Sequence, residues 1–247
     1  MANSKKTYGL IGKKLDHSFS TKYFAEKFAK ENISNAEYLN FPLEKIEDIR
    51  SLLKKEKNLA GLNITIPYKR QILPFLNKLS PEAKKVGAVN TIEFKDGLMI
   101  GHNTDVIGFE QSLTPLLNKK HKTALLFGTG GASKAVEFVL KKLKIPFKIV
   151  SRTKTKHTLT LKEINKRTLL EHEILINTTP LGTFPKVDEC LDITYQGLNA
   201  HHLVYDLVYN PEETLFLQKA KKQGSKIKNG REMLELQAEA SWAIWNN

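Results

Sequence analysis

The clearest candidate for chemistry is a glycine-rich run in the middle of the chain. Phe127-Gly128-Thr129-Gly130-Gly131-Ala132-Ser133 follows a short apolar segment and precedes a stretch with helical periodicity. Glycines allow a tight turn and a close approach of the backbone, while the N–H groups at a helix start attract an anion. The pattern is typical of the turn that binds the pyrophosphate of a dinucleotide. The candidate contacts are Gly128, Thr129, Gly130, Gly131 and Ala132.

A basic segment follows the next apolar stretch and indicates which dinucleotide is bound. NAD sites usually place Asp or Glu there to bind the ribose 2′-hydroxyl. This chain instead reads Ser151-Arg152-Thr153-Lys154-Thr155-Lys156, without a carboxylate. A guanidinium, hydroxyls and ammonium groups suit a dianionic 2′-phosphate, although a solvated basic loop has the same composition. With the glycine run, the segment favours NADP, and the candidate contacts are Ser151, Arg152, Thr153 and Lys156.

Short apolar segments alternate with amphipathic ones along the chain, which predicts an α/β protein with a largely parallel sheet. A hairpin is expected where 88–93 and 98–100 flank Asp96-Gly97. The other expected strands are 7–12, 36–41, 61–66, 123–127, 147–150, 174–177 and 203–207. The expected helices are 20–31, 43–56, 74–85, 106–117, 132–143, 211–223 (followed by Gly224) and 231–245.

Composition narrows the class of protein. The 247 residues are 40% hydrophobic and carry a net charge of +13, with lysines spread as doublets on polar faces. Solvated surfaces explain that charge best, attraction of small anions comes next, and nucleic-acid binding last, because no nucleic-acid motif is present. A single cysteine, Cys190, and histidines without ligand spacing predict no metal. No signal peptide or membrane-spanning stretch is expected, so the prediction is a cytoplasmic protein.

Polar clusters at the ends of predicted strands have ordinary explanations when taken singly. His17-Ser18-Phe19-Ser20 could only cap a helix, Lys69 could be an exposed lysine, and Asn90 and Asp105 could be turn residues. Their order along the chain is more specific. Asp16 to Ser20, Gly61 to Lys69, Gly87 to Thr91 and Gly101 to Gly108 resemble successive motifs of the shikimate dehydrogenase family. The glycine run, Ser151-Arg152-Thr153, Asn177 to Gly182, Asp206 to Pro211 and Gly230 to Ala238 continue that resemblance over nearly the whole chain.

The resemblance implies an NADP-dependent oxidoreductase of aromatic amino-acid (chorismate) biosynthesis, which interconverts 3-dehydroshikimate and shikimate. Lys69 and Asp105 match the family's catalytic pair, and Leu207 and Gly230 would lie near the nicotinamide. Hydride transfer to a ketone leaves an alkoxide that a lysine ammonium can stabilise and protonate. The residues implied to bind the substrate are Ser18, Ser20, Thr65, Asn90, Tyr209 and Gln237.

The resemblance also implies two domains with a deep cleft between them. The expected substrate domain comprises residues 1–104 with 231–247, and a Rossmann-like NADP domain comprises 105–230, in a monomer or a homodimer. Trp242 and Trp245 are interpreted as packing residues, and His17, His102 and Cys190 as structural or incidental.

Three features depart from the family pattern, and Ser133 departs from the general dinucleotide fingerprint, which has Gly or Ala there. Thr21 stands where the family's commonest first motif has Pro, and Ser151 replaces Asn. The span from Arg152 to Asn177 is short, and 155–163 alternates like a strand, so one crossover helix is expected to be missing or reduced. Two alternatives stay open: a quinate or quinate/shikimate dehydrogenase that uses NAD, and a non-catalytic NADP-binding protein.

Overall fold

A computed structural model of the protein describes residues 5–15 and 18–247. Two compact units are present, one built from Met1–Ile107 with Gln237–Asn247, the other from Gly108–Leu236. The division falls inside two helices, α4 (Asp105–Leu113) and α8 (Arg231–Trp245). Each unit has its own six-stranded sheet with helices against it, which confirms the predicted α/β class.

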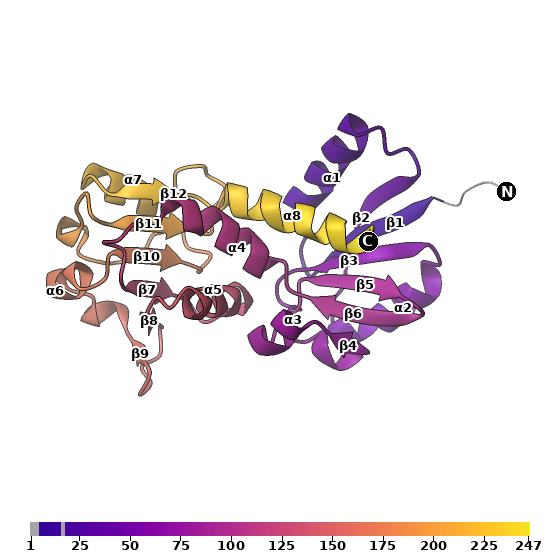
Figure 1. Ribbon diagram of the computed structural model, residues 1–247, viewed down its shortest axis with the longest axis horizontal. Coiled ribbons are helices and arrows are strands. Elements are labelled where there is room, and N and C mark those ends of the chain that lie inside the picture. Colours follow the sequence, from indigo (N-terminus) through magenta and orange to yellow (C-terminus); the bar gives the residue numbers. More distant parts are fainter. Residues whose placement is uncertain (1–4, 16–17) are drawn as a thin grey trace. The chain divides into compact units, whose positions relative to one another are not determined.

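The first unit contains a mixed sheet with the strand order β2-β1-β3-β5-β6-β4 (Figure 1). Strands β1, β2 and β3 are parallel, whereas β5 runs antiparallel to β3 and β6. Asp96 and Gly97 both have positive φ values, 52° and 72°, as the tight turn of a β5–β6 hairpin requires. The predicted hairpin is therefore confirmed. The strands are β1 (Lys6–Gly12), β2 (Ala36–Pro42), β3 (Leu59–Ile64), β4 (Lys78–Leu79), β5 (Thr91–Lys95) and β6 (Leu98–His102).

Alternation along β1 and β3 separates two apolar clusters, one on each face of this sheet. Tyr8 and Leu10 pack in a cluster with residues of α1 (Phe19–Lys30) and α8. Leu62 and Ile64 pack instead with residues of α2 (Ile49–Lys55). Asn63, between those two, therefore faces the side of α8, where its Nδ2 donates to Ser241 Oγ at 3.0 Å. A polar residue in the middle of a buried strand thus has a partner on the last helix.

The second unit is a doubly wound parallel sheet with the order β12-β11-β10-β7-β8-β9. Its chain starts at β7, continues outward to β8 and β9, and returns to β10 on the other side of β7. Ligands of such sheets bind at the carboxyl ends of the strands where the order reverses, here between β7 and β10. The strands are β7 (Ala124–Phe127), β8 (Phe147–Val150), β9 (Thr158–Leu159), β10 (Ile174–Asn177), β11 (Leu203–Asp206) and β12 (Lys226–Lys228). The helices that follow them are α5 (Gly131–Lys142), α6 (Lys166–Leu170) and α7 (Leu215–Lys222), with 3₁₀ turns at Thr114–Leu116 and Tyr195–Gly197.

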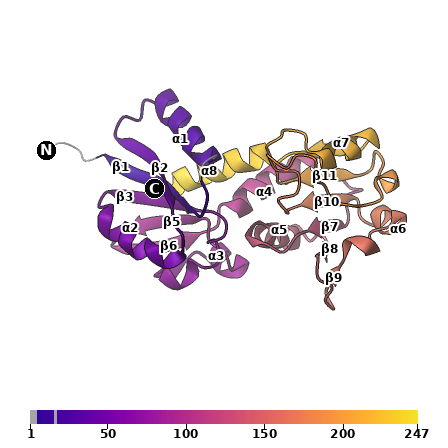
Figure 2. The same cartoon turned by 180° about the vertical axis from the view of Figure 1, so that it is seen from behind.

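The expected loss of a crossover helix is confirmed at the β8–β9 connection. Parallel neighbours usually need a crossover of a dozen or more residues. Here residues 151–157 join β8 to β9 without a helix, and the next crossover holds only a 3₁₀ turn (Leu161–Glu163) and the short α6. Figures 1 and 2 both show this connection projecting beyond the other strands of its sheet. The strand expected over 155–163 is correct only at Thr158–Leu159.

Three helix predictions were wrong in extent. Residues 74–85 form a 3₁₀ turn (Leu73–Phe75), β4 and α3 (Pro81–Val86), because Ser80 accepts a hydrogen bond from Ala83 N and starts a new helix there. Residues 43–56 contain a 3₁₀ turn (Ile46–Asp48) before α2. The helix expected from Pro211 begins only at Leu215, because Thr214 is its N-cap. Gly224, with a φ of 81°, follows the end of that helix as predicted.

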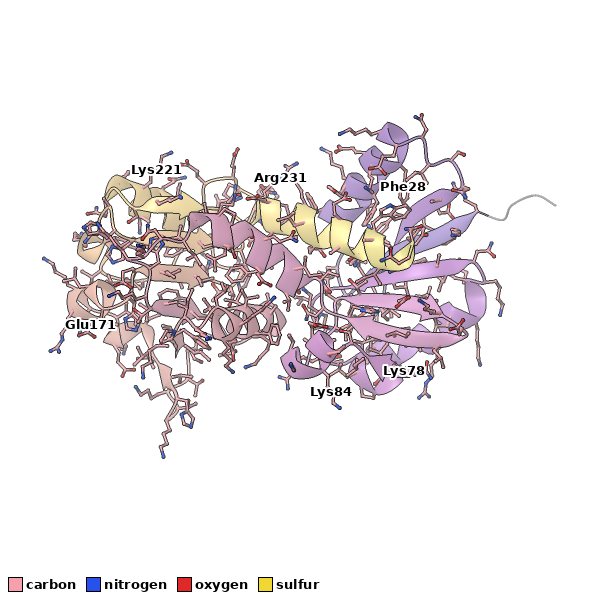
Figure 3. The ribbon with its side chains drawn as sticks, viewed as in Figure 1. Phe28, Lys78, Lys84, Glu171, Lys221 and Arg231 are labelled. Carbon is pink, nitrogen blue, oxygen red and sulfur yellow. The ribbon has the colours of Figure 1, made fainter. Side chains whose placement is uncertain are left out.

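The excess of basic residues lies largely on outer faces. Figure 3 shows Lys78, Lys84 and Lys221 pointing away from the ribbon. Within the described ranges, no helix has the length and apolar character to cross a membrane.

Candidate functional site

Lys69 and Asp105 form an ion pair in the first unit. The Nζ of Lys69 lies 2.7 Å from Oδ2 of Asp105, and the two side chains are 15% and 7% exposed. These residues are 36 positions apart in the sequence. Because so little of this ion pair is exposed, water and salt weaken its attraction less than they would at an open surface.

The backbone around each partner is held by local contacts. Pro67 follows β3, and the next residue, Tyr68, is buried and donates its hydroxyl to Leu43 O at 2.6 Å. Lys69 itself accepts Val89 N through its carbonyl, at 2.8 Å. This hydrogen bond joins the segment that follows β3 to the segment that precedes β5.

Asp105 is the first residue of α4, where the helix dipole favours a carboxylate. The preceding loop is held by Asn103, whose Nδ2 donates to Ala88 O at 2.9 Å and whose Oδ1 accepts Val106 N. These hydrogen bonds hold the N-terminal end of α4, and therefore the backbone of Asp105, in place.

Asn90 joins Asp105 to the last helix. Its Nδ2 lies 3.0 Å from Asp105 Oδ1 and 3.3 Å from Gln237 Oε1. Both Asn90 and Gln237 are buried. Four residues from distant parts of the sequence, Lys69, Asn90, Asp105 and Gln237, are therefore in one connected cluster.

The other candidates of this unit are Ser18, Ser20 and Thr65, whereas Asp16 and His17 lie outside the described residues. Ser18 is the N-cap of α1, and its Oγ accepts from Thr21 N at 3.3 Å, so the capping interpretation is correct. A capping hydroxyl still has its hydrogen to donate to an anion. Ser20 is half-buried in the first turn of α1, and Thr65 follows β3, where its backbone bonds Ile11 O.

In the second unit, the glycine run forms a turn between β7 and α5. Gly128 has a φ of 113°, and a Cβ there would lie 2.5 Å from Thr178 Oγ1, so only glycine fits without strain. Gly130 is the N-cap of α5 and makes no side-chain cap, which leaves the first N–H groups of that helix for an anion. Ser133, which departs from the fingerprint, donates to Gly128 O at 2.8 Å and closes the turn.

The basic loop at 151–157 is exposed apart from its first residue. Ser151 N donates to Leu159 O, and Thr155 N donates to Thr158 Oγ1, which folds the loop back on β9. Lys154 is paired with Glu163, and Glu163 also accepts from Thr160, so its pKa is lowered to about 2. Arg152 and Lys156 have no side-chain partner among the residues that the structure covers.

Leu207 and Gly230, predicted near the nicotinamide, do lie together. A Cβ on Gly230 would be 2.1 Å from Leu207 O, so a larger residue would separate the two segments. Tyr209 follows on the same loop, half-buried, and burial raises the pKa of its hydroxyl.

Asp206, at the end of β11, has an unusual environment for a carboxylate. It is fully buried and accepts hydrogen bonds from Thr214 Oγ1, Asn177 Nδ2 and Val208 N. Burial outweighs these donors and raises its pKa to about 6. Its contacts join the ends of β10 and β11 to α7, which is a structural role.

Sequence reasoning missed Ser241 on α8. Its hydroxyl is fully buried within hydrogen-bonding distance of Thr91, Thr104 and Asn63. The signal was a serine on the apolar face of the last helix, four residues after Gln237.

The doubly wound sheet of the second unit, with a glycine turn at its reversal point, defines a dinucleotide-binding α/β protein. The first unit adds a buried lysine–carboxylate pair, an arrangement that can transfer a proton. Together these features are those of an α/β oxidoreductase.

Comparisons with known proteins give the family. Residues 10–92 match the model of the shikimate dehydrogenase substrate binding domain. The NADP⁺-dependent shikimate dehydrogenase of Staphylococcus epidermidis is 36% identical over 98% of this chain and 92% of its own length. The corresponding protein of Pelagibacter ubique is 38% identical over 98% and 94%. A Thermus thermophilus shikimate 5-dehydrogenase, solved with NADP(H) and shikimate, aligns with a TM-score of 0.84 at 28% identity over 97% and 93%. The chain belongs to the shikimate dehydrogenase family.

Proposed function

We propose that this protein is an NADP-dependent shikimate dehydrogenase that reversibly reduces 3-dehydroshikimate to shikimate in aromatic amino-acid biosynthesis. The observation that carries the proposal is the shielded Lys69–Asp105 pair, 2.7 Å apart and hydrogen-bonded through Asn90 to Gln237. Within a chain of this family, such a pair provides a proton donor beside groups that can bind ring hydroxyls.

NADPH, when bound, supplies the hydride for the ketone carbon. Lys69 then stabilises the developing alkoxide with its ammonium and delivers a proton from Nζ. Asp105 holds that ammonium in place through its 2.7 Å contact, and a proton taken up from water restores the charged form of Lys69. In the oxidation direction Lys69 accepts the proton, with Asp105 or water as the relay.

Substrate binding is assigned to hydroxyl and amide groups. Ser18 and Ser20 donate to the carboxylate of the substrate, since a hydroxyl that already accepts one bond can still donate. The ring hydroxyls and the carboxylate accept or donate further hydrogen bonds, which are assigned to Thr65, Asn90, Tyr209 and Gln237.

The second unit fits NADP in two respects. The uncapped start of α5 and the open space around Gly130 suit the pyrophosphate. Arg152 and Lys156 suit the 2′-phosphate, with Ser151 and Thr153 as hydroxyl partners. Leu207 and Gly230 provide the surface for the nicotinamide.

The cellular form proposed with this activity is a cytoplasmic enzyme, monomeric or homodimeric, with its substrate domain in residues 1–104 and 231–247. It binds small molecules rather than nucleic acid.

Initial rates of nicotinamide absorbance test the function. Purified protein receives shikimate or quinate, each with NADP⁺ or NAD⁺, and Lys69→Ala is measured beside the wild type. Turnover with shikimate and NADP⁺ that falls by about 10²-fold or more in Lys69→Ala supports the proposal. Preference for quinate or NAD⁺ favours the quinate dehydrogenase alternative. Binding of NADPH without turnover of either substrate favours a non-catalytic NADP-binding protein.

A further inference from the structure

Three buried hydroxyls meet between the hairpin of the first unit and the last helix. Thr91 Oγ1 and Ser241 Oγ lie 2.8 Å apart, Ser241 and Thr104 lie 3.1 Å apart, and Thr91 and Thr104 lie 3.2 Å apart. All three side chains are 0% exposed. Each hydroxyl can donate one hydrogen and accept two, so the three atoms form a closed triangle in which every oxygen has partners.

The triangle is attached to the ion pair through Asn90. The Oδ1 of Asn90 accepts Thr104 N at 2.7 Å, and Thr91 Oγ1 lies 3.2 Å from it. The NH₂ end of the same amide also reaches the triangle, since Asn90 Nδ2 lies 2.9 Å from Thr104 Oγ1. That end donates to Asp105 Oδ1 at 3.0 Å, and Asp105 in turn holds Lys69.

On its other side, the triangle is joined to the centre of the sheet. Asn63 Nδ2 lies 3.0 Å from Ser241 Oγ and 3.1 Å from Thr91 Oγ1, while Asn63 Oδ1 accepts Tyr38 OH at 2.8 Å. Ser241 is the one member of the triangle that comes from α8. Its hydroxyl also lies 2.9 Å from the carbonyl of Gln237, one helical turn earlier.

We infer that Ser241 is a positioning residue of the active site, which orients the Asn90 amide toward Asp105 by completing the Thr91–Thr104–Ser241 triangle. The inference rests on the proposed function, because it concerns the proton transfer assigned to Lys69 and Asp105. Without the Ser241 oxygen, Thr91 and Thr104 lose a shared partner and Asn63 loses an acceptor in a site without water access. The two threonine hydroxyls then turn to other acceptors, and the Asn90 amide loses its single orientation.

The structure offers a matched control for Ser241→Ala. Ser112 is another buried serine in a helix, and it also bonds the carbonyl four residues earlier, at 2.7 Å to Gly108 O. Its second partner is the buried Tyr205, which lies in the second unit as Ser112 does, and among the described residues no charged group of the proposed mechanism touches Ser112. Ser112→Ala therefore measures the loss of a buried serine hydroxyl that has no connection to Asn90 through Thr91 and Thr104.

The experiment compares wild type, Ser241→Ala, Ser241→Cys and Ser112→Ala for kcat, both KM values, pH–rate profile and melting temperature. We expect Ser241→Ala and Ser241→Cys to lower kcat by about three- to tenfold, the weight of one or two hydrogen bonds. Their KM for NADP⁺ should be unchanged. Their pH–rate profile should differ from that of the wild type, because the 3.0 Å contact of the Asn90 amide with Asp105 is no longer held in one geometry. Ser112→Ala should lower only the melting temperature.

Wild-type kcat and pH profile in both Ser241 variants would overturn the inference, as would equal kcat losses in Ser241→Ala and Ser112→Ala. Ser241→Cys fills the space of the hydroxyl but forms only weak hydrogen bonds, so it tests the role of Ser241 even if the alanine variant does not fold. The wild type in the same assay reports on the proposed function separately. An inactive wild type contradicts the dehydrogenase assignment, whereas an active wild type with unaffected variants contradicts only the role of Ser241.

Discussion

At the scale of single residues, two of the buried carboxylates, Asp105 and Asp206, have opposite surroundings. Asp105 has a lysine ammonium 2.7 Å away and an amide donor at 3.0 Å. Asp206 is paired with no cation, only with a hydroxyl, an amide and a backbone N–H. We propose a proton-transfer role for Asp105 beside its cation, whereas Asp206, buried among neutral donors, joins β10 and β11 to α7 and becomes sensitive to pH.

Replacing Asp105 by Asn should separate catalysis from cofactor binding. The amide keeps the shape of the side chain but no longer attracts the lysine ammonium, so we expect kcat to fall by about 10²-fold. NADPH binding should be unchanged, because the residues assigned to it lie in the second unit. Kinetics with shikimate and a fluorescence titration of NADPH measure the two effects. Asp96→Asn, in the exposed hairpin turn, is the control, and equal losses in both variants would contradict the assignment.

Asp206 should make the stability of the protein depend on pH. Its pKa rises from the ordinary 3.8 to about 6 on folding, so the folded protein binds the proton more tightly than the unfolded chain. The stabilisation is complete below about pH 4 and is lost as pH rises through about 6, at about 1.4 kcal/mol per pKa unit. Asp206→Asn, which mimics the protonated form, should therefore gain about 2 to 3 kcal/mol relative to wild type between pH 4 and 7. Urea unfolding at the two pH values measures this, and a constant difference would show that Asp206 does not titrate there.

At the scale of elements, the second unit contains two short loops whose conformations depend on different properties of their residues. The glycine turn depends on backbone conformation, since Gly128 has positive φ and contacts Thr178. The loop at 151–157 replaces a crossover helix and depends on side-chain charge, with Lys154 already paired to Glu163. Substitutions in the glycine turn should therefore change stability or NADPH binding, whereas substitutions in the charged loop should change the preference between NADP and NAD.

Two alanine substitutions in the glycine turn should differ in stability. Gly128→Ala forces a side chain into the left-handed region and against Thr178, which costs about 1 to 3 kcal/mol and also distorts the turn. Gly130→Ala meets open space, so we expect a melting temperature near that of wild type. The added methyl group should nevertheless block the approach of the pyrophosphate and weaken NADPH binding by about tenfold or more. Unchanged NADPH binding in Gly130→Ala would contradict the assignment of this turn.

The charged loop should determine the preference for NADP over NAD. Arg152→Ala and Lys156→Ala should each raise the KM for NADP⁺ by about 10- to 100-fold, since each removes a charged hydrogen bond of about 1.5 to 3 kcal/mol. The KM for NAD⁺ should change little. Lys154→Ala is the matched control, with a smaller effect expected because Glu163 already pairs with that lysine. Equal changes for both cofactors would show that the loop does not read the 2′-phosphate.

At the scale of the whole molecule, the chain returns to its first unit through α8. Trp245 is 8% exposed, donates its indole N–H to Ile92 O at 2.9 Å and packs against Gly61, where a Cβ would lie 2.4 Å from the ring. Ring contacts with Tyr8 and Phe24 surround it. The apolar cluster of the first unit is therefore incomplete without α8.

Trp245→Ala should destabilise the protein by about 3 to 5 kcal/mol, the usual cost of removing a large buried aromatic side chain. Trp242→Ala should cost less, because that ring is only partly buried. Denaturant unfolding followed by circular dichroism compares the two. Equal losses would show that the C-terminal turn packs less specifically than these contacts indicate.

Local pattern predicted most of the elements but misplaced some of their ends. Apolar runs, the Asp96-Gly97 turn and the glycine fingerprint each act over a few residues. Most of the strands, the hairpin and the turn between β7 and α5 were therefore predicted correctly. The helix expected over 74–85 was wrong because Asn77 and Lys78 extend toward β6, where Asn77 N donates to Met99 O at 2.9 Å. That contact joins distant segments, and no local propensity reports it.

The sequence by itself determined the α/β class, and its short motifs predicted the dinucleotide turn and the site residues Lys69, Asp105, Asn90 and Gln237. Only the tertiary structure decided that these four meet, since their contacts span up to 147 positions and depend on how sheets and helices pack. It also decided that Ser241 shares a buried triangle with Thr91 and Thr104. A lone serine on an apolar helix face carries no motif, and its role arises from the hydroxyls that folding brings to within hydrogen-bonding distance of it.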